Sequence, residues 1–216
     1  MKIAPSLLAA DFAHLAAEVA RVAPEADLLH VDCMDGHYVP NLSFGPPVVK
    51  ALRAHTDLFF DCHLMVDNPG TLLDAFADAG ADGITVHVEL GDPRPLLDRI
   101  RALGLRVGLT FEPGTPYSAV QPYLAEIDIL LVMSVRTGFG GQAFIPEVLD
   151  KVRAARAEID ARGLAVEIEI DGGIKIDNAH LAIDAGVDIL VSGTGIFGAD
   201  DPLAAARAMR NGSARP

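Results

Sequence analysis

Basic residues, cysteines and long apolar runs are all scarce in this chain of 216 residues, and each scarcity excludes a class of protein. The 17 Lys and Arg residues are outnumbered by 30 Asp and Glu residues, which leaves a formal net charge of −13. A chain this acidic repels nucleic acid and anionic membranes, so we expect neither as a partner. Every apolar run is broken well before the ~20 residues that span a membrane, and MKIAPSLLAADF lacks the apolar core of a signal peptide. We therefore expect a cytoplasmic protein.

The two cysteines, Cys33 and Cys62, point to a reduced interior. Each stands next to a candidate polar site residue on a predicted strand. Because side chains alternate along a strand, both thiols should face away from that site and toward packed helices. We interpret them as reduced core thiols without a redox role.

What the chain does contain is an alternation of short β-branched or Leu-rich runs with Ala-rich amphipathic stretches. Its composition, 50% hydrophobic with a mean hydropathy of +0.31, is enough for a sizeable core. The predicted strands are KIAPSLL, DLLHVD, LFFDCHL, GITVHV, RVGLTF, IDILLVMS, AVEIEID and DILVSG. The predicted helices cover residues 11–22, 46–55, 69–79, 93–103, 115–124, 146–162, 175–185 and 202–209. Turns of the type AGAD and AGVD place Gly where a helix end requires positive φ.

Eight strand–helix units in this length predict an α/β protein that forms a single-domain (β/α)₈ TIM barrel. The barrel should span residues 1–210, followed by a frayed tail, 211–216. A doubly wound open sheet is the alternative fold. It loses support because APSLLAAD stands where a Gly-rich dinucleotide fingerprint would follow the first strand.

Polar residues collect at the predicted strand ends, which is where barrels of this class carry their chemistry. His30 and Asp32 share one face of the second strand, His63 ends the third, and Asp171 ends the seventh. Two imidazoles and two carboxylates suit Zn²⁺, Fe²⁺, Mn²⁺ or Co²⁺, whereas Ca²⁺ prefers oxygen ligands alone. We therefore expect one such divalent ion per chain.

Several motifs, in order and over nearly the whole chain, resemble those of the ribulose-phosphate 3-epimerases. They are APSLLAADF, HVDCMDGHYVPN followed by FGPPVVKALR, CHLMV, MSVRTGFGGQAFIPEVLDKVR and EIDGGI. The resemblance implies a (β/α)₈ barrel that interconverts ribulose 5-phosphate and xylulose 5-phosphate, in the pentose phosphate pathway, by moving a proton at C3. It further implies His30, Asp32, His63 and Asp171 as metal ligands, Asp32 and Asp171 as the acid/base pair, and a homo-oligomer.

The chemistry gives its own reason for two carboxylates. Inversion beside a carbonyl removes a proton from one face and returns one to the other, which is simplest with a base on each side. The second and seventh strands are separated only by the first and eighth around the ring. Asp32 and Asp171 can therefore flank a sugar at the barrel mouth, with the metal stabilising the enediolate charge.

The substrate phosphate needs local N–H donors, and Gly-rich stretches follow the last three predicted strands. The resemblance assigns substrate binding to Ser6, His63, Gly138, Phe139, Gly140, Gly141, Gly172, Gly173, Gly193 and Thr194. It also places Met34, Met65 and Met133 along the site, although ordinary core filling explains these methionines equally well. His87 and Glu169 are candidates to orient the ligands from behind, while His14, His55 and His180 should be surface groups.

The chain departs from the family pattern at Arg136-Thr137, where many members have Asn-Pro, and at Thr194, where Ser is commoner. These positions bear on the substrate's identity, so an epimerase of a related ketose phosphate such as allulose 6-phosphate is the alternative. A Schiff-base aldolase is unsupported because none of the lysines ends a predicted strand. The related orotidine-phosphate decarboxylases carry Asp-x-Lys where DCH places His63. A non-catalytic phosphosugar-binding protein is a remote alternative, since both proton-transfer carboxylates are present.

Overall fold

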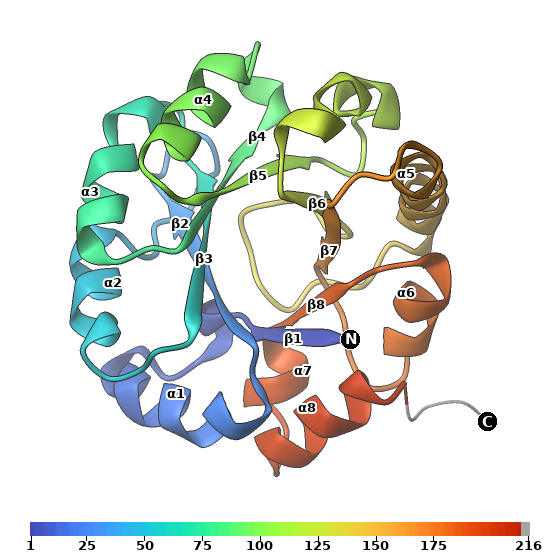
Figure 1. Cartoon of the computed structure of the whole chain (residues 1–216). Coiled ribbons are helices and arrows are strands. Elements are labelled where there is room, and N and C mark those ends of the chain that lie inside the picture. The colour runs from blue at the N-terminus through green and yellow to red at the C-terminus, as the bar shows by residue number, and fades with distance from the viewer. Residues whose placement is uncertain (213–216) are drawn as a thin grey trace.

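Eight parallel strands follow one another around a ring in the computed structural model, which describes residues 1–212 (Figure 1). The strands are β1 (Lys2–Pro5), β2 (Leu28–Met34), β3 (Phe59–Met65), β4 (Gly83–His87), β5 (Arg106–Phe111), β6 (Ile129–Met133), β7 (Glu167–Asp171) and β8 (Ile189–Ser192). From β2 to β8 each strand pairs with the next one in sequence, and β8 pairs with β1. A single parallel bridge between Ser6 and His30 joins β1 to β2. The predicted (β/α)₈ barrel is therefore confirmed.

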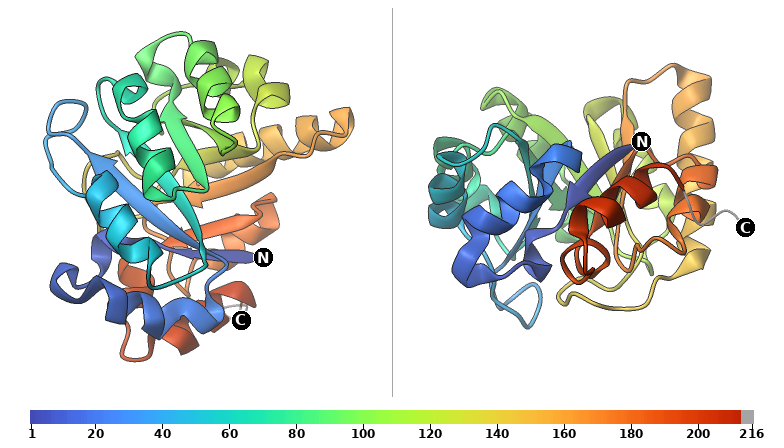
Figure 2. Two further views of the ribbon diagram at one scale, coloured as in Figure 1. Left: turned by 60° about the vertical axis from the view of Figure 1, so that its left-hand side comes forward. Right: turned by 90° about the horizontal axis from the view of Figure 1, so that it is seen from below.

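Helices form an outer layer around this ring (Figures 1 and 2). They are α1 (Leu15–Val22), α2 (Pro46–Arg53), α3 (Leu73–Ala79), α4 (Arg94–Ala102), α5 (Leu149–Arg162), α6 (Ala179–Ala185), α7 (Thr194–Phe197) and α8 (Pro202–Arg210). No helix in residues 1–212 is long and apolar enough to cross a bilayer. The expected frayed tail lies outside the described residues from 213 onward.

The helix prediction for residues 115–124 is wrong. Two short 3₁₀ helices, Tyr117–Ala119 and Gln121–Glu126, stand there instead. Pro122 lacks the N–H that a helix interior needs, and its ring clashes with the preceding turn. Four other predicted helices start three or four residues late, at Leu15, Leu73, Leu149 and Ala179, and the one-turn helix α7 was not predicted.

Side chains alternate between two different environments along the strands. The outward residues, Cys33 and Cys62 included, pack against the helices in the largest apolar cluster, as predicted. The inward residues in the middle of the barrel include the polar side chains of His30, Asp61, Thr85 and Glu169, all fully buried. A polar interior is costly unless its groups are paired, so this layer must serve the site above it.

At the N-terminal edge of the barrel, an aspartate joins β1 to β2, β3 to β4, β5 to β6 and β7 to β8. It stands just before an even-numbered strand, and its Oδ2 accepts a 2.8 Å bond from a backbone N–H of the preceding odd-numbered strand. The four pairs are Asp27 with Ile3, Asp82 with Phe60, Asp128 with Val107, and Asp188 with Ile168. The repeated Asp therefore caps strand backbone that the sheet leaves unpaired.

The glycines in AGAD and AGVD end α3 and α6 in the predicted way. Gly80 has φ +97° and Gly186 has φ +103°, a left-handed conformation that glycine adopts without strain. Each helix thereby turns directly into the aspartate before the next strand, Asp82 or Asp188. Helix end and strand start are fixed by the same short segment.

We expect Asp82→Ala to lower the free energy of unfolding by about 1–3 kcal/mol, because the buried Phe60 N–H loses its acceptor. Arg53 loses its 2.8 Å ion pair in the same variant. Urea unfolding measures the loss. Asp57→Ala is the matched control, since the Asp57 carboxylate is exposed and makes no bond among the described residues. Equal stability of the two variants would contradict the capping role.

Candidate active site

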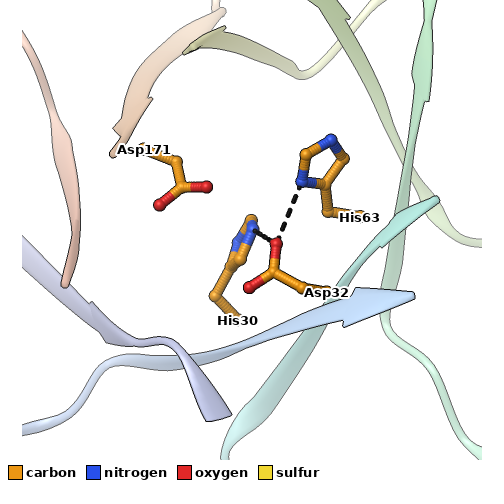
Figure 3. Close-up of side chains that lie close together, drawn as sticks. All are labelled: His30, Asp32, His63 and Asp171. Atoms are coloured by element: carbon orange, nitrogen blue, oxygen red, sulfur yellow. Dashed lines mark hydrogen bonds and ion pairs between the residues drawn. The ribbon is translucent and has the colours of Figure 1, made fainter. Parts of the chain in front are cut away.

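Four side chains from three strands meet at the C-terminal end of the barrel (Figure 3). His30 and Asp32 lie on β2, His63 on β3 and Asp171 on β7. One potential ligand atom from each lies within 4.8 Å of all the others. His30, Asp32 and His63 are buried, and Asp171 is half-buried at the opening. The residues predicted to converge are thus brought together.

Asp32 is the centre of this cluster. Its Oδ1 lies 3.4 Å from His30 Nε2 and 3.3 Å from His63 Nδ1. Its Oδ2 accepts a 2.7 Å hydrogen bond from the Ser6 hydroxyl. Because Ser6 also forms the bridge that closes β1 onto β2, barrel closure and carboxylate orientation depend on one residue.

A carboxylate behind His30 fixes how this imidazole faces the site. His30 Nδ1 lies 2.7 Å from Asp61 Oδ2 and 3.4 Å from Glu169 Oε1, all fully buried. The Nδ1–H donates to Asp61, so the opposite nitrogen, Nε2, points into the cluster. Nε2 is buried without a hydrogen-bond partner.

A longer chain of bonds orients His63. Its Nε2 lies 2.8 Å from His87 Nε2, and His87 Nδ1 lies 3.2 Å from Glu89 Oε2. Burial lowers the pKa of His63 to about 4 and also lowers the pKa of His87, so both rings are neutral near pH 7. Glu89 can only accept, so His87 donates from Nδ1 and accepts at Nε2. His63 then donates from Nε2, and its Nδ1 lone pair faces Asp32.

The two candidate acid/base carboxyls have opposite environments. Burial alone would raise the pKa of Asp32, but the neighbouring His30, whose own pKa is raised, holds it well below its usual range. Burial, and then the charge of Asp32, raise the pKa of Asp171 to about 7. Near neutral pH Asp32 is therefore ionised while Asp171 readily holds a proton. Two neighbouring carboxyls whose pKa values are shifted in opposite directions are typical of acid/base pairs.

The layer beneath shows the same excess of negative charge. Burial by itself would lower the pKa of His30, but the surrounding carboxylates, chiefly Asp32, raise it well above its ordinary value. Burial, and then the charge of Asp61, raise the pKa of Glu169 to about 8. In this layer acidic groups outnumber cations, and the raised pKa values of His30 and Glu169 mean that these groups hold protons that reduce the net negative charge. A bound cation could take the place of those protons.

The donor set fits a divalent transition metal. The unpartnered Nε2 of His30 and the Nδ1 lone pair of His63 both face Asp32, and Asp171 completes a mixed nitrogen and oxygen set. A second group, His30 with Asp61 and Glu169, also lies close enough to hold an ion. The 2.7 Å bond between His30 and Asp61 leaves no room for one there, so this group supports His30 instead.

A pocket opens above the cluster, and loops late in the chain form most of its wall. Every expected substrate residue except His63 lines it, as do all three expected methionines. These are Ser6, Gly138, Phe139, Gly140, Gly141, Gly172, Gly173, Gly193, Thr194, Met34, Met65 and Met133. His63 lies beneath, fully buried. Asp32 and Asp171 are the charged groups of its floor.

Sequence reasoning named His87 and Glu169 as supports, and both contact a histidine of the cluster. It missed Asp61 and Glu89. Strand alternation could have found Asp61, which precedes His63 by two residues on β3, but Glu89 lies in a 3₁₀ turn beyond β4, where alternation no longer applies. Among the expected surface histidines, His14 and His55 are exposed, but His180 is half-buried, so that expectation was wrong for His180.

Fold and site together define a (β/α)₈-barrel enzyme with a metal-capable centre. The sequence pattern of the ribulose-phosphate 3 epimerase family matches residues 2–197. A ribulose-phosphate 3-epimerase of Mycobacterium tuberculosis is 54% identical over 209 residues, 96% of this chain and 91% of that protein. The cytoplasmic isoform of Oryza sativa is 46% identical over 215 residues, 97% of this chain and 92% of that protein.

The chain belongs to the ribulose-phosphate 3-epimerase family, and it is an isomerase of the epimerase class. Solved structures with lower identity share the fold. The 3-hexulose-6-phosphate synthase of Salmonella typhimurium has a TM-score of 0.75 at 20% identity, covering 98% of both chains. Orotidine 5′-phosphate decarboxylase of Pyrococcus horikoshii has a TM-score of 0.71 at 18% identity, covering 99% of both.

Proposed function

We propose that this epimerase inverts C3 of D-ribulose 5-phosphate to give D-xylulose 5-phosphate, in the pentose phosphate pathway, with one divalent metal ion per chain. The observation that carries the proposal is the convergence of His30, Asp32, His63 and Asp171 below one pocket. The family of the chain supports the reaction.

The metal would be held by His30 Nε2, His63 Nδ1 and one oxygen each of Asp32 and Asp171. When bound, Zn²⁺, Fe²⁺, Mn²⁺ or Co²⁺ supplies positive charge that favours loss of the proton beside the carbonyl. The chain's own residues hold this arrangement in place. Asp61 orients His30, and the chain through His87 to Glu89 orients His63.

Proton transfer falls to Asp32 and Asp171. Asp32 is held ionised by its neighbours and accepts the C3 proton from one face of the substrate. Asp171, which lines the pocket from the end of β7, delivers a proton to the other face. Their strands, β2 and β7, are separated around the ring by β1 and β8, so the two carboxyls reach the pocket from different directions. The two groups exchange roles in the reverse direction.

The phosphate would lie against the Gly-rich segments that end in Gly141, Gly173 and Gly193. Backbone N–H groups of such loops donate to phosphate oxygens, and small glycines allow close approach. Structural neighbours that share this barrel are named for the phosphorylated compounds hexulose 6-phosphate and orotidine 5′-phosphate, which supports a phosphate at this end.

A related ketose phosphate such as allulose 6-phosphate is the second candidate. Arg136, Thr137 and Thr194, which depart from the family pattern, all line the pocket near its phosphate end. A larger sugar would meet these residues first. The remote alternative, a phosphosugar-binding protein without catalysis, would leave the acid/base pair without a purpose.

We infer a homo-oligomer in the cytoplasm. The label of the Oryza sativa relative as a cytoplasmic isoform and the buried free thiols of Cys33 and Cys62 support that compartment. The acidic charge of −13 argues against nucleic acid and anionic membranes as partners.

We expect the purified chain, stripped by a chelator, to lose activity and to regain it with one equivalent of Co²⁺ or Zn²⁺. His63→Ala should bind the ion at least roughly tenfold more weakly, because one of its ligands is gone. Elemental analysis and chelator competition measure both quantities. Full activity after exhaustive chelation would end the metal assignment.

We expect Gly193→Ala to raise KM for the phosphorylated ketose severalfold with little change in kcat. A Cβ at Gly193 would come within 3.0 Å of the Ala9 Cβ and displace the turn that starts α7. Steady-state kinetics measure the change. Gly114→Ala, where a Cβ meets nothing within 4 Å, is the control. An unchanged KM in Gly193→Ala would place the phosphate elsewhere.

Asp32→Asn and Asp171→Asn should each lower turnover by about 10²–10⁴-fold, as expected for loss of a positioned acid or base. In D₂O, each variant that retains metal should exchange the C3 proton of one epimer without inverting it, and the two variants should act on opposite epimers. NMR follows exchange and inversion separately. A metal-bound Asp171→Asn that interconverts the epimers at the parent rate would refute the two-base mechanism.

A further inference from the structure

Thr137 is bonded to Glu112, a residue outside its own loop. Its hydroxyl and its backbone N–H both donate to the Glu112 carboxylate, the N–H bond being 3.4 Å long. Glu112 directly follows β5, and Thr137 lies in the loop between β6 and α5. Both side chains are half-buried. Residues 25 apart in sequence are thus tied together beside the pocket.

A proline at this position could make neither bond. It has no N–H and no hydroxyl, and its ring restricts φ instead. A threonine leaves the loop backbone freer, and ordering a freer backbone costs conformational entropy on binding. In this chain the Glu112 carboxylate supplies an external restraint where the ring is absent.

The segment that Thr137 begins is the one that covers the pocket. Gly138, Phe139, Gly140 and Gly141 all line it. The Gly138 carbonyl accepts a 2.9 Å bond from Asn41 Nδ2, and Gln142 Nε2 bonds the Phe139 carbonyl at 2.8 Å. Asn41 and Gln142 therefore hold the middle of the loop, whereas Glu112 holds its start.

Glu112 is also connected to the support of the metal-capable cluster. Its backbone N–H donates a 2.8 Å bond to Glu89 Oε1, and Glu89 Oε2 lies 3.2 Å from His87 Nδ1. His87 in turn contacts His63. The loop over the pocket and the histidine beneath it are thus held by one continuous set of bonds.

We propose that Glu112 is a positioning residue that, through Thr137, holds the β6–α5 loop ready to bind the substrate's phosphate. The inference rests on the proposed function in that the phosphate lies beneath this loop. Glu112 touches no reacting atom, so its loss weakens phosphate binding and leaves the proton-transfer step unchanged.

Thr137→Val removes the hydroxyl while keeping the shape of the side chain. We expect its KM for D-ribulose 5-phosphate to rise roughly three- to tenfold, about 0.7–1.4 kcal/mol, with kcat within about twofold of the parent. Inorganic phosphate, titrated calorimetrically into the metal-loaded enzyme, should bind more weakly by the same factor. Thr137→Ser should restore both values, because serine keeps the donor.

Glu112→Ala should weaken phosphate binding at least as much as Thr137→Val does. The double variant should bind phosphate as well as Glu112→Ala alone, because the hydroxyl of Thr137 has then already lost its acceptor. Glu112→Gln keeps an acceptor without the negative charge, so it should bind phosphate at least as well as Glu112→Ala does. Thr71→Val is the matched control. It deletes an exposed hydroxyl bonded to the Asn68 carbonyl at 2.9 Å, away from the pocket lining.

Two results would overturn the inference: independent, multiplying effects of Thr137→Val and Glu112→Ala, or a fall in kcat at constant KM and constant phosphate affinity. The phosphate titration separates this inference from the proposed function. If the parent binds phosphate and the variants weaken that binding, the inference stands even where no ketose phosphate is epimerised. If the parent epimerises ketose phosphates and the variants bind phosphate normally, the inference alone fails.

Discussion

Buried negative charge at the centre of the barrel is the constraint on which the site depends. Asp32, Asp61 and Glu169 are all fully or nearly fully buried, and Asp171 stands at their opening. The imidazoles of His30 and His63 cannot balance four carboxyls, so Glu169 and Asp171 take up protons near neutral pH. A divalent cation replaces protons at such a site at lower electrostatic cost, since it can contact several ligands together.

The fold makes this arrangement rigid from two sides. Below, an aspartate before each even-numbered strand fixes the start of the preceding strand, so strand register is set at the end opposite the site. Above, Ser6 both closes the ring and bonds Asp32. Because the strands are short and fully packed, a shift at either end would rotate His30 and Asp32 away from the pocket. The pairing of the strands therefore also determines the geometry of the metal-capable cluster.

Strand alternation and motif order were enough to predict the barrel, the four converging side chains and the pocket lining. They could not supply contacts that depend on neighbouring strands. Asp61 was visible as part of DCH, yet only the pairing of β2 with β3 shows that it bonds His30. Glu89 lies just beyond β4 in a 3₁₀ turn, where alternation ends. The helix predicted over residues 115–124 failed because amphipathic spacing was given more weight than Pro122.

The acidic surface and the proposed phosphate-binding role place opposite demands on this chain. A net charge of −13 repels a phosphate dianion, but salt screens that repulsion beyond about 8 Å at physiological ionic strength. Affinity must then arise inside the pocket, where the glycine loops present backbone donors and the floor itself is acidic. Backbone donors bind an anion well only when they are already ordered, since each ordered residue costs conformational entropy. An ordered β6–α5 loop therefore contributes more to phosphate affinity in this acidic chain than it would in a basic one. That gives a physical reason for a carboxylate, Glu112, beside the proposed phosphate site despite its charge.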